Sequence, residues 1–169
     1  MARIYVGGPS GSGKTAACKL VAKKLGISCL TGSEIMMKAA NVSSREELGQ
    51  LPQETKNNLR LTAFEVYYKT TPNLIIDGHF YLTEADVKYF DAYVLVGLDT
   101  DSLIRFRNAD NSRIRSNSKQ DIENEVAQVI NRVQEFESEF KVKVLKIEND
   151  SSLEGLANKV EGIYSSVMS

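Results

Sequence analysis

The chain has 169 residues, of which 42% are hydrophobic and 25% charged, and its formal net charge is −1. This length and composition predict a single globular domain, residues 1–169, with one hydrophobic core. A net charge close to zero provides no overall attraction to nucleic acid or to anionic lipid, so any phosphate binding depends on local charge. No apolar run approaches the roughly 20 residues that are needed to span a bilayer.

Two features of the sequence predict a cytoplasmic protein. Cys18 and Cys29 lie in apolar surroundings without a CxxC motif or a Cys/His spacing, which favours buried thiols in a reducing compartment over a disulfide. The first residues run directly into an expected strand, without the basic lead or the cleavage site of a signal peptide. We therefore expect no membrane partner.

Short apolar runs predict the five strands of a parallel sheet. Residues 4–6, 74–76 and 93–96 are continuously apolar, as expected for strands that are buried on both faces. Residues 29–30 and 142–147 are weaker candidates, and the lysines of the second of these suit an edge strand.

Apolar residues at helical spacing occupy the intervening segments. The stripe over residues 17–25 is followed by Gly26, a typical C-cap, and longer stripes cover residues 122–140 and 153–167. Such stripes can bind a partner, but packing on a sheet is favoured because every strand–helix unit needs such a face. The alternation predicts an α/β fold with a doubly wound, parallel, five-stranded sheet flanked by helices.

Two segments are too long or too polar to be simple crossovers. Residues 31–71 contain about three helical segments with breaks near Asn41 and Pro52, and residues 105–120 are polar and rich in arginine. We interpret both as mobile attachments to a single core.

The strongest motif is a phosphate-binding loop between the first expected strand and the first expected helix. It matches the whole pattern G-x-x-x-x-G-K-[ST] in the context that this pattern requires. The glycines let backbone N–H groups point inward around an anion at the start of a helix. Lys14 is expected to reach the β- and γ-phosphates of ATP, and the hydroxyl of Thr15 to coordinate Mg²⁺. The expected ATP-binding residues of the loop are Gly8, Pro9, Ser10, Gly11, Ser12, Gly13, Lys14 and Thr15.

Asp77 and His79 follow the strand that is expected at residues 74–76. A carboxylate at the end of a buried parallel strand faces the crevice in which such folds bind ligands, so we expect Asp77 to hold Mg²⁺ through water. An ordinary Asp-Gly turn is the alternative. His79, the only histidine, either contacts a substrate phosphate or packs in the interior, and the sequence favours neither. No neighbouring histidine or cysteine supports a zinc site.

An arginine cluster is the third signal. Arg105, Arg107, Arg113 and Arg115 lie within eleven residues, with Asp110 as the only acid among them. Such a cluster is often a solvated face, but beside a bound triphosphate its guanidinium groups stabilise the transferring phosphoryl group. A polar segment that folds over the site also excludes water.

These motifs together resemble the nucleoside monophosphate kinases, and specifically the archaeal type of adenylate kinase. Residues 77–79 are similar to the Asp-Thr-His strand end of that family, and residues 113–115 to the Arg-x-Arg of its lid. Residues 128–132 resemble its Gln-x-x-Asn-Arg helix, and residues 44–54 resemble the helical segment over the acceptor nucleotide.

The resemblance implies phosphoryl transfer from ATP to AMP with Mg²⁺ as cofactor. Residues 31–71 are then the acceptor-binding insertion, residues 105–120 are the lid, and Asn149 lies in the segment that meets the adenine ring. The implied catalytic residues are Lys14, Asp77, Arg113 and Arg115, with Thr15 and Asp77 at the metal. The implied acceptor-binding residues are Thr31, Ser33, Arg45, Arg60 and His79.

The sequence departs from this family on the acceptor side. Gly49 stands where the family tends to have an arginine for the AMP phosphate, so Arg45 or Arg60 would have to replace it. Residues 80–88 are shorter than the corresponding family loop, and Ser33 stands where an aspartate is usual. The acceptor therefore stays open between AMP, another nucleotide and a small hydroxylated metabolite.

A second family shares some of these features. Residues 121–129, together with residues 77–79, resemble the adenylate-kinase-like ATPases that act in maturation of the small ribosomal subunit. That resemblance implies ATP hydrolysis stimulated by a ribosomal protein or RNA, and fold alone does not separate the two activities. The pair Arg113 and Arg115 favours the kinase.

Overall fold

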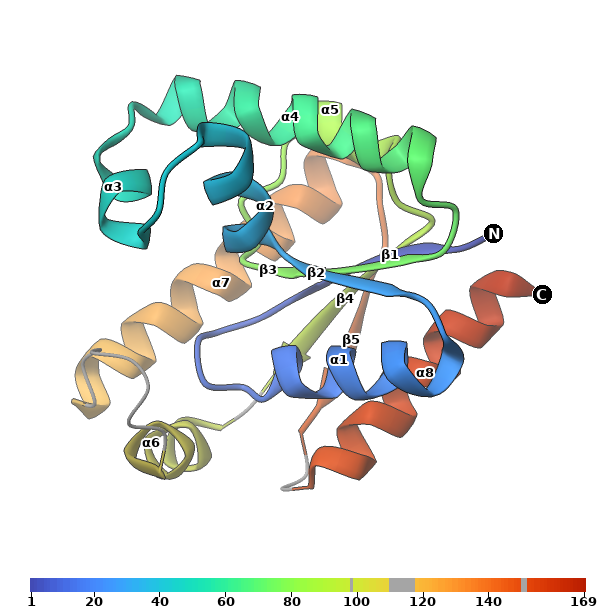
Figure 1. The fold of residues 1–169 in the computed structure, drawn as a ribbon. Coiled ribbons are helices and arrows are strands. Elements are labelled where there is room, and N and C mark those ends of the chain that lie inside the picture. Colours follow the sequence, from blue (N-terminus) through green and yellow to red (C-terminus); the bar gives the residue numbers. More distant parts are fainter. Residues whose placement is uncertain (98, 110–117, 150–151) are drawn as a thin grey trace.

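The computed structural model describes residues 1–97, 99–109, 118–149 and 152–169. Strands and helices alternate, with additional helices between β2 and β3 and between β4 and β5 (Figure 1). Among the described residues, no helix has both the length and the apolar composition that a membrane crossing requires. The strands are β1 Arg3–Gly7, β2 Ser28–Thr31, β3 Leu74–Gly78, β4 Ala92–Gly97 and β5 Val144–Glu148. The helices are α1 Lys14–Leu25, α2 Gly32–Ala40, α3 Arg45–Gln50, α4 Gln53–Thr70, α5 Glu84–Val87, α6 Thr100–Ala109, α7 Lys119–Phe140 and α8 Leu153–Met168.

The five strands form one parallel sheet in the order β2-β3-β1-β4-β5. This arrangement confirms the predicted doubly wound α/β fold. The three continuously apolar strands, β3, β1 and β4, occupy the centre of the sheet, where both faces are covered. The lysine-bearing strand β5 lies at an edge, as predicted, and Lys146 on that strand pairs with Glu137 of α7 at 3.5 Å.

The sheet is covered by helices on both faces (Figure 1). Successive residues of β1 point to opposite sides, as the period of a strand requires. Ile4 and Val6 belong to the core that packs against α1 and α8. Tyr5, between them, belongs to the second core, with residues of α2, α4 and α7. Most of the helical stripes therefore pack on the sheet, whereas Ile122 and Val126 of α7 pack against α6.

Residues 31–71 form three helices, as predicted, and their ends have clear local causes. The side chain of Thr31 caps α2 in a capping box with Glu34, and α2 ends at Asn41, which adopts a left-handed conformation with φ 53°. Ser44 caps α3, and α4 begins directly after Pro52. Proline suits this place because it has no backbone N–H to donate.

The segment after β4 differs from the prediction of a polar attachment at residues 105–120. Its first part is the end of α6, in which Leu103 is fully buried and packs in a small core with Ile122 of α7. Arg107 is also buried, at 4% exposure. The predicted catalytic residues Arg113 and Arg115 lie outside the described residues.

Candidate functional site

The loop between β1 and α1 has the conformation that its glycines allow. Gly11 and Gly13 have φ values of 86° and 82°, in the left-handed region that favours glycine. A Cβ atom on Gly11 would lie 2.9 Å from Cγ of Arg107, and one on Gly13 would lie 3.0 Å from Nδ2 of Asn149. Both glycines are therefore required by backbone conformation and by close packing.

Three side chains from distant parts of the chain hold this loop from outside. Nε of Arg107 donates to the carbonyl oxygen of Ser10 at 3.0 Å, and Oε1 of Glu125 accepts from the backbone N–H of Ser10 at 2.8 Å. Arg107 and Glu125 also form an ion pair with each other. Nδ2 of Asn149 donates to the carbonyl oxygen of Ser12 at 2.9 Å. The loop is therefore tied to α6, α7 and the segment after β5.

Sequence reasoning missed Glu125 and treated Arg107 only as a member of a cluster. Glu125 lies outside the apolar stripe of its helix and carries no motif, so no local signal relates it to Ser10. For Asn149, the expected place beside an adenine ring stays a prediction, and the contact that the structure shows is with the phosphate loop at Ser12.

Lys14, Thr15 and Asp77 come together at the carboxyl ends of the central strands, as predicted. Nζ of Lys14 donates to the carbonyl oxygen of Pro9 at 3.1 Å, so the lysine curls back over its own loop. The hydroxyl of Thr15 donates to Oδ2 of Asp77, which is 3% exposed at the end of β3. A hydroxyl and a carboxylate placed in this way are the hard oxygen donors that Mg²⁺ prefers.

No group of three or more histidine, cysteine or acidic residues that would form an all-protein metal site occurs in the described part of the chain. Mg²⁺ is usually bound by one or two carboxylates together with substrate phosphates, and Thr15 and Asp77 can serve in a site of that kind. The residues present therefore fit a magnesium ion that arrives with a nucleotide.

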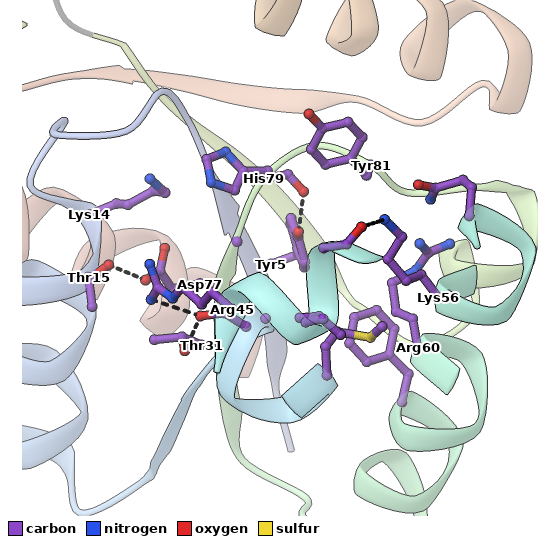
Figure 2. A pocket seen from close by; sticks show the side chains of 18 residues that line it. Tyr5, Lys14, Thr15, Thr31, Arg45, Lys56, Arg60, Asp77, His79 and Tyr81 are labelled. Carbon is purple, nitrogen blue, oxygen red and sulfur yellow. Dashed lines mark hydrogen bonds between the residues drawn. The ribbon is translucent and has the colours of Figure 1, made fainter. Parts of the chain in front are cut away.

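A pocket of about 490 Å³ opens beside these residues and extends under the helices of the insertion (Figure 2). Apolar walls are provided by Met36, Leu48 and Phe64. The structure brings all five of the residues that were predicted to bind the acceptor to the lining of this one pocket, namely Thr31, Ser33, Arg45, Arg60 and His79. Lining residues that were not predicted to bind the acceptor include Lys56 and Tyr81.

The cations of this pocket differ in how far their charge is already compensated. Arg60 donates from Nε and from a terminal nitrogen to the two carboxylate oxygens of Asp86, at 3.2 and 2.9 Å, and Asp86 is fully buried. Arg45 donates to the hydroxyl of Ser33 at 3.0 Å. Among the described residues, Lys56 approaches the carbonyl oxygen of Gly49, at 3.5 Å. In the described part of the chain, neither Arg45 nor Lys56 forms an ion pair.

His79 and Tyr81 both line the pocket, with ring centres 6.1 Å apart. The guanidinium group of Arg132, on α7, stacks on the Tyr81 ring at 4.0 Å. The His79 carbonyl oxygen accepts a hydrogen bond of 2.5 Å from the hydroxyl of Tyr5. Burial, and to a smaller extent Asp77, raises the pKa of Tyr5 well above its usual value, so Tyr5 remains a hydrogen-bond donor. The backbone after β3 is thereby anchored under the pocket.

Both cysteines are free thiols, as predicted. Cys18, on α1, is fully buried, whereas Cys29, on β2, is half-buried.

The comparisons with known proteins agree with this architecture. A sequence model of the AAA domain family matches residues 7–140. A search of curated protein sequences found no match. Among solved structures, shikimate kinase from Acinetobacter baumannii in complex with shikimate is similar, with a TM-score of 0.69, 14% identity and coverage of 98% of this chain and 94% of that one.

Two other solved structures show the same relationship. Shikimate kinase from Bacteroides thetaiotaomicron has a TM-score of 0.67 and 14% identity, and the alignment covers 97% of this chain and 98% of that one. A gluconokinase from Sinorhizobium meliloti 1021 has a TM-score of 0.59 and 11% identity, with coverage of 98% and 93%. At these identities the similarity establishes the shared fold, that of the phosphate-loop kinases.

Proposed function

The chain belongs to the AAA domain family, and on this premise we propose that it is an ATP-dependent phosphotransferase whose acceptor is a small anionic molecule. The phosphate loop is the donor site, and the pocket of about 490 Å³ beside it is the acceptor site. Its volume suits a metabolite or a mononucleotide, since small-molecule pockets commonly measure about 300–1,000 Å³.

The charge of the pocket is the observation that carries this proposal. Its lining includes four cationic side chains and a single carboxylate, Asp77, and a second carboxylate, Asp86, pairs with one of the four, Arg60. The whole chain has a formal net charge of −1, so this local excess of positive charge does not reflect the composition. A concave site with one sign of charge attracts ligands of the opposite sign. The cationic residues are Lys14, Arg45, Lys56 and Arg60.

Each residue has a definite task in this proposal. The backbone N–H groups of the loop and Lys14 bind the ATP phosphates. Thr15 and Asp77 would hold Mg²⁺, which would supply positive charge against the phosphates. Arg113 and Arg115 remain our candidates for stabilising the transferring group. The helices of the insertion line the acceptor pocket and limit the access of water, the competing acceptor.

Two kinds of anionic acceptor satisfy this description. AMP is the acceptor that the resemblance to adenylate kinases implies. A hydroxylated carboxylate is the other, because one structural neighbour is a shikimate kinase that binds shikimate and another is a gluconokinase. We therefore propose the small-molecule phosphotransferase as the function, with AMP as one member of the acceptor panel.

The test is the rate of ADP formation from MgATP with AMP, GMP, CMP, UMP, shikimate, gluconate or no acceptor, with inorganic phosphate followed in parallel. At least one anionic acceptor should accelerate ADP formation without an equal release of phosphate. If phosphate is released at the same rate with every acceptor as without one, the proposal of a phosphotransferase is wrong. That result would favour an ATPase that acts on a macromolecular partner.

A further inference from the structure

We infer that the anionic group of the acceptor binds to Lys56, at the end of the pocket remote from the phosphate loop, and that the acceptor presents a hydroxyl group to ATP. This inference rests on the proposed phosphotransferase function and narrows its acceptor to hydroxylated compounds that carry a distant carboxylate or phosphate group.

Lys56 contributes a positive charge to the lining of the pocket. It lies in the first part of α4, it is half-buried, and it lines the pocket. Its contact with the Gly49 carbonyl oxygen, at 3.5 Å, is too long for a strong hydrogen bond. Gly49 also lines the pocket, and a Cβ atom added to it would meet nothing within 4 Å. No acidic residue among the described ones pairs with Lys56.

The local sequence does not favour a lysine at this position. Lys56 and Arg60 are four residues apart on the same helix, and like charges at this spacing repel each other. For Arg60, the buried carboxylate of Asp86 offsets this cost, and Asp86 accepts further hydrogen bonds from the backbone and the hydroxyl of Thr83. Lys56 has no such partner among the described residues. An anionic ligand would supply one.

Figure 2 shows that Lys56 lies on the opposite side of the pocket from the residues of the donor site. Lys14, Thr15 and Asp77 are on one side, and Lys56 and Arg60 are on the other. The reacting atom of the acceptor must lie on the side of Lys14, where the γ-phosphate is delivered. An anion on Lys56 is therefore a different part of the acceptor from the atom that reacts.

This separation distinguishes the two kinds of acceptor. In AMP the phosphate is both the anion and the nucleophile, so it would have to lie near Lys14, and Lys56 would face the uncharged nucleoside. In a hydroxylated acid the two groups are separate. The hydroxyl oxygen then forms a bond to the γ-phosphorus, and the bond between that phosphorus and the ADP oxygen breaks. The hydroxyl proton passes to an oxygen of the transferred phosphoryl group and then to solvent.

The test compares Lys56→Met with Lys69→Met in the whole protein. Lys69 lies on the same helix and pairs with Glu65 at 2.7 Å, outside the pocket, so it controls for the loss of one lysine from α4. Shikimate, its uncharged methyl ester, glycerol 3-phosphate and AMP serve as acceptors. Binding of each to the MgADP-bound protein is measured by calorimetry, and KM and kcat by ADP formation.

We expect Lys56→Met to raise the KM and Kd of the favoured hydroxylated anion about 10-fold or more, because the variant loses one charge-assisted hydrogen bond to that anion. In Lys56→Met, the KM for ATP and the Kd of the methyl ester should be unchanged. In Lys69→Met, the KM and Kd of every acceptor should equal those of the wild-type protein. This inference would be wrong if AMP were the one acceptor of the panel that reacts and Lys56→Met left the KM for AMP unchanged. The proposal of a phosphotransferase would then still hold. Unchanged binding of every hydroxylated anion in Lys56→Met would overturn this inference as well. If no acceptor reacts or binds to the wild-type protein, both proposals fail.

Discussion

The buried ion pair between Arg60 and Asp86 makes a sharp prediction about stability. Asp86 is fully buried, and the side chain of Arg60 is 11% exposed. Asp86→Ala would leave the guanidinium group, together with the N–H and hydroxyl groups of Thr83, without their acceptor. Breaking such a pair from one side costs about 3–5 kcal/mol, because a charge stays buried without compensation.

This loss is large compared with the total stability of a typical domain, about 5–15 kcal/mol. At about 2–4 °C per kcal/mol for a chain of this size, the melting temperature of Asp86→Ala should fall by about 6–20 °C. The free energy of unfolding is measured by urea denaturation, and the melting temperature by calorimetry.

The double variant Arg60→Met/Asp86→Leu is the matched control. Replacing both partners by apolar residues removes the buried charges together, so the double variant should lose much less stability than Asp86→Ala. A loss below about 1 kcal/mol in Asp86→Ala, or equal losses in the single and double variants, would refute the compensation of Arg60 by Asp86.

Four further outcomes are expected. Lys14→Ala should abolish turnover. In a thermal shift assay, MgATP at 100 times its Kd should stabilise the wild-type protein by about 2.7 kcal/mol, and it should not stabilise Lys14→Ala. Glu125→Ala should raise the KM for ATP more than it lowers kcat, because it removes a contact of the phosphate loop at Ser10 and no contact of the acceptor. An unchanged KM for ATP would contradict the role of the contact between Glu125 and Ser10. Alanine at Arg113 or Arg115 should lower kcat by on the order of 10²-fold, whereas an effect on the KM for ATP alone would assign them to ground-state binding. Burial, followed by the charge of Asp77, raises the pKa of Cys29 to about 11. Folding therefore favours the protonated form of Cys29, and the rate of iodoacetamide labelling should stay low up to pH 9 and rise toward pH 11. A labelling rate that reaches half its maximum near the free-thiol pKa of about 8.5 would contradict this.

The same shift predicts how stability depends on pH. The contribution of Cys29 is fully present below the unfolded pKa of about 8.5 and is lost as the pH rises toward the folded value of about 11. Cys29→Ala should therefore lose less stability than the wild-type protein between these two pH values.

Much of the fold and the centre of the site follow from local patterns. The apolar runs at residues 4–6, 74–76 and 93–96 identify the central strands, because a strand that is buried on both faces leaves no place for polar residues. The phosphate loop, the acid at the end of β3 and the helix breaks at Asn41 and Pro52 are likewise determined by residues within one or two turns of the chain.

The contacts that give the site its character depend on tertiary structure. Ser10 meets Glu125, and Arg60 meets Asp86, only because the folded chain brings their segments together. No periodicity relates residues so far apart in the chain. For the same reason, sequence reasoning treated Arg60 as a cation open to the acceptor and did not notice Lys56. The residue types establish which charges are present, but only the packed structure decides which of them are compensated by a neighbour and which face the pocket.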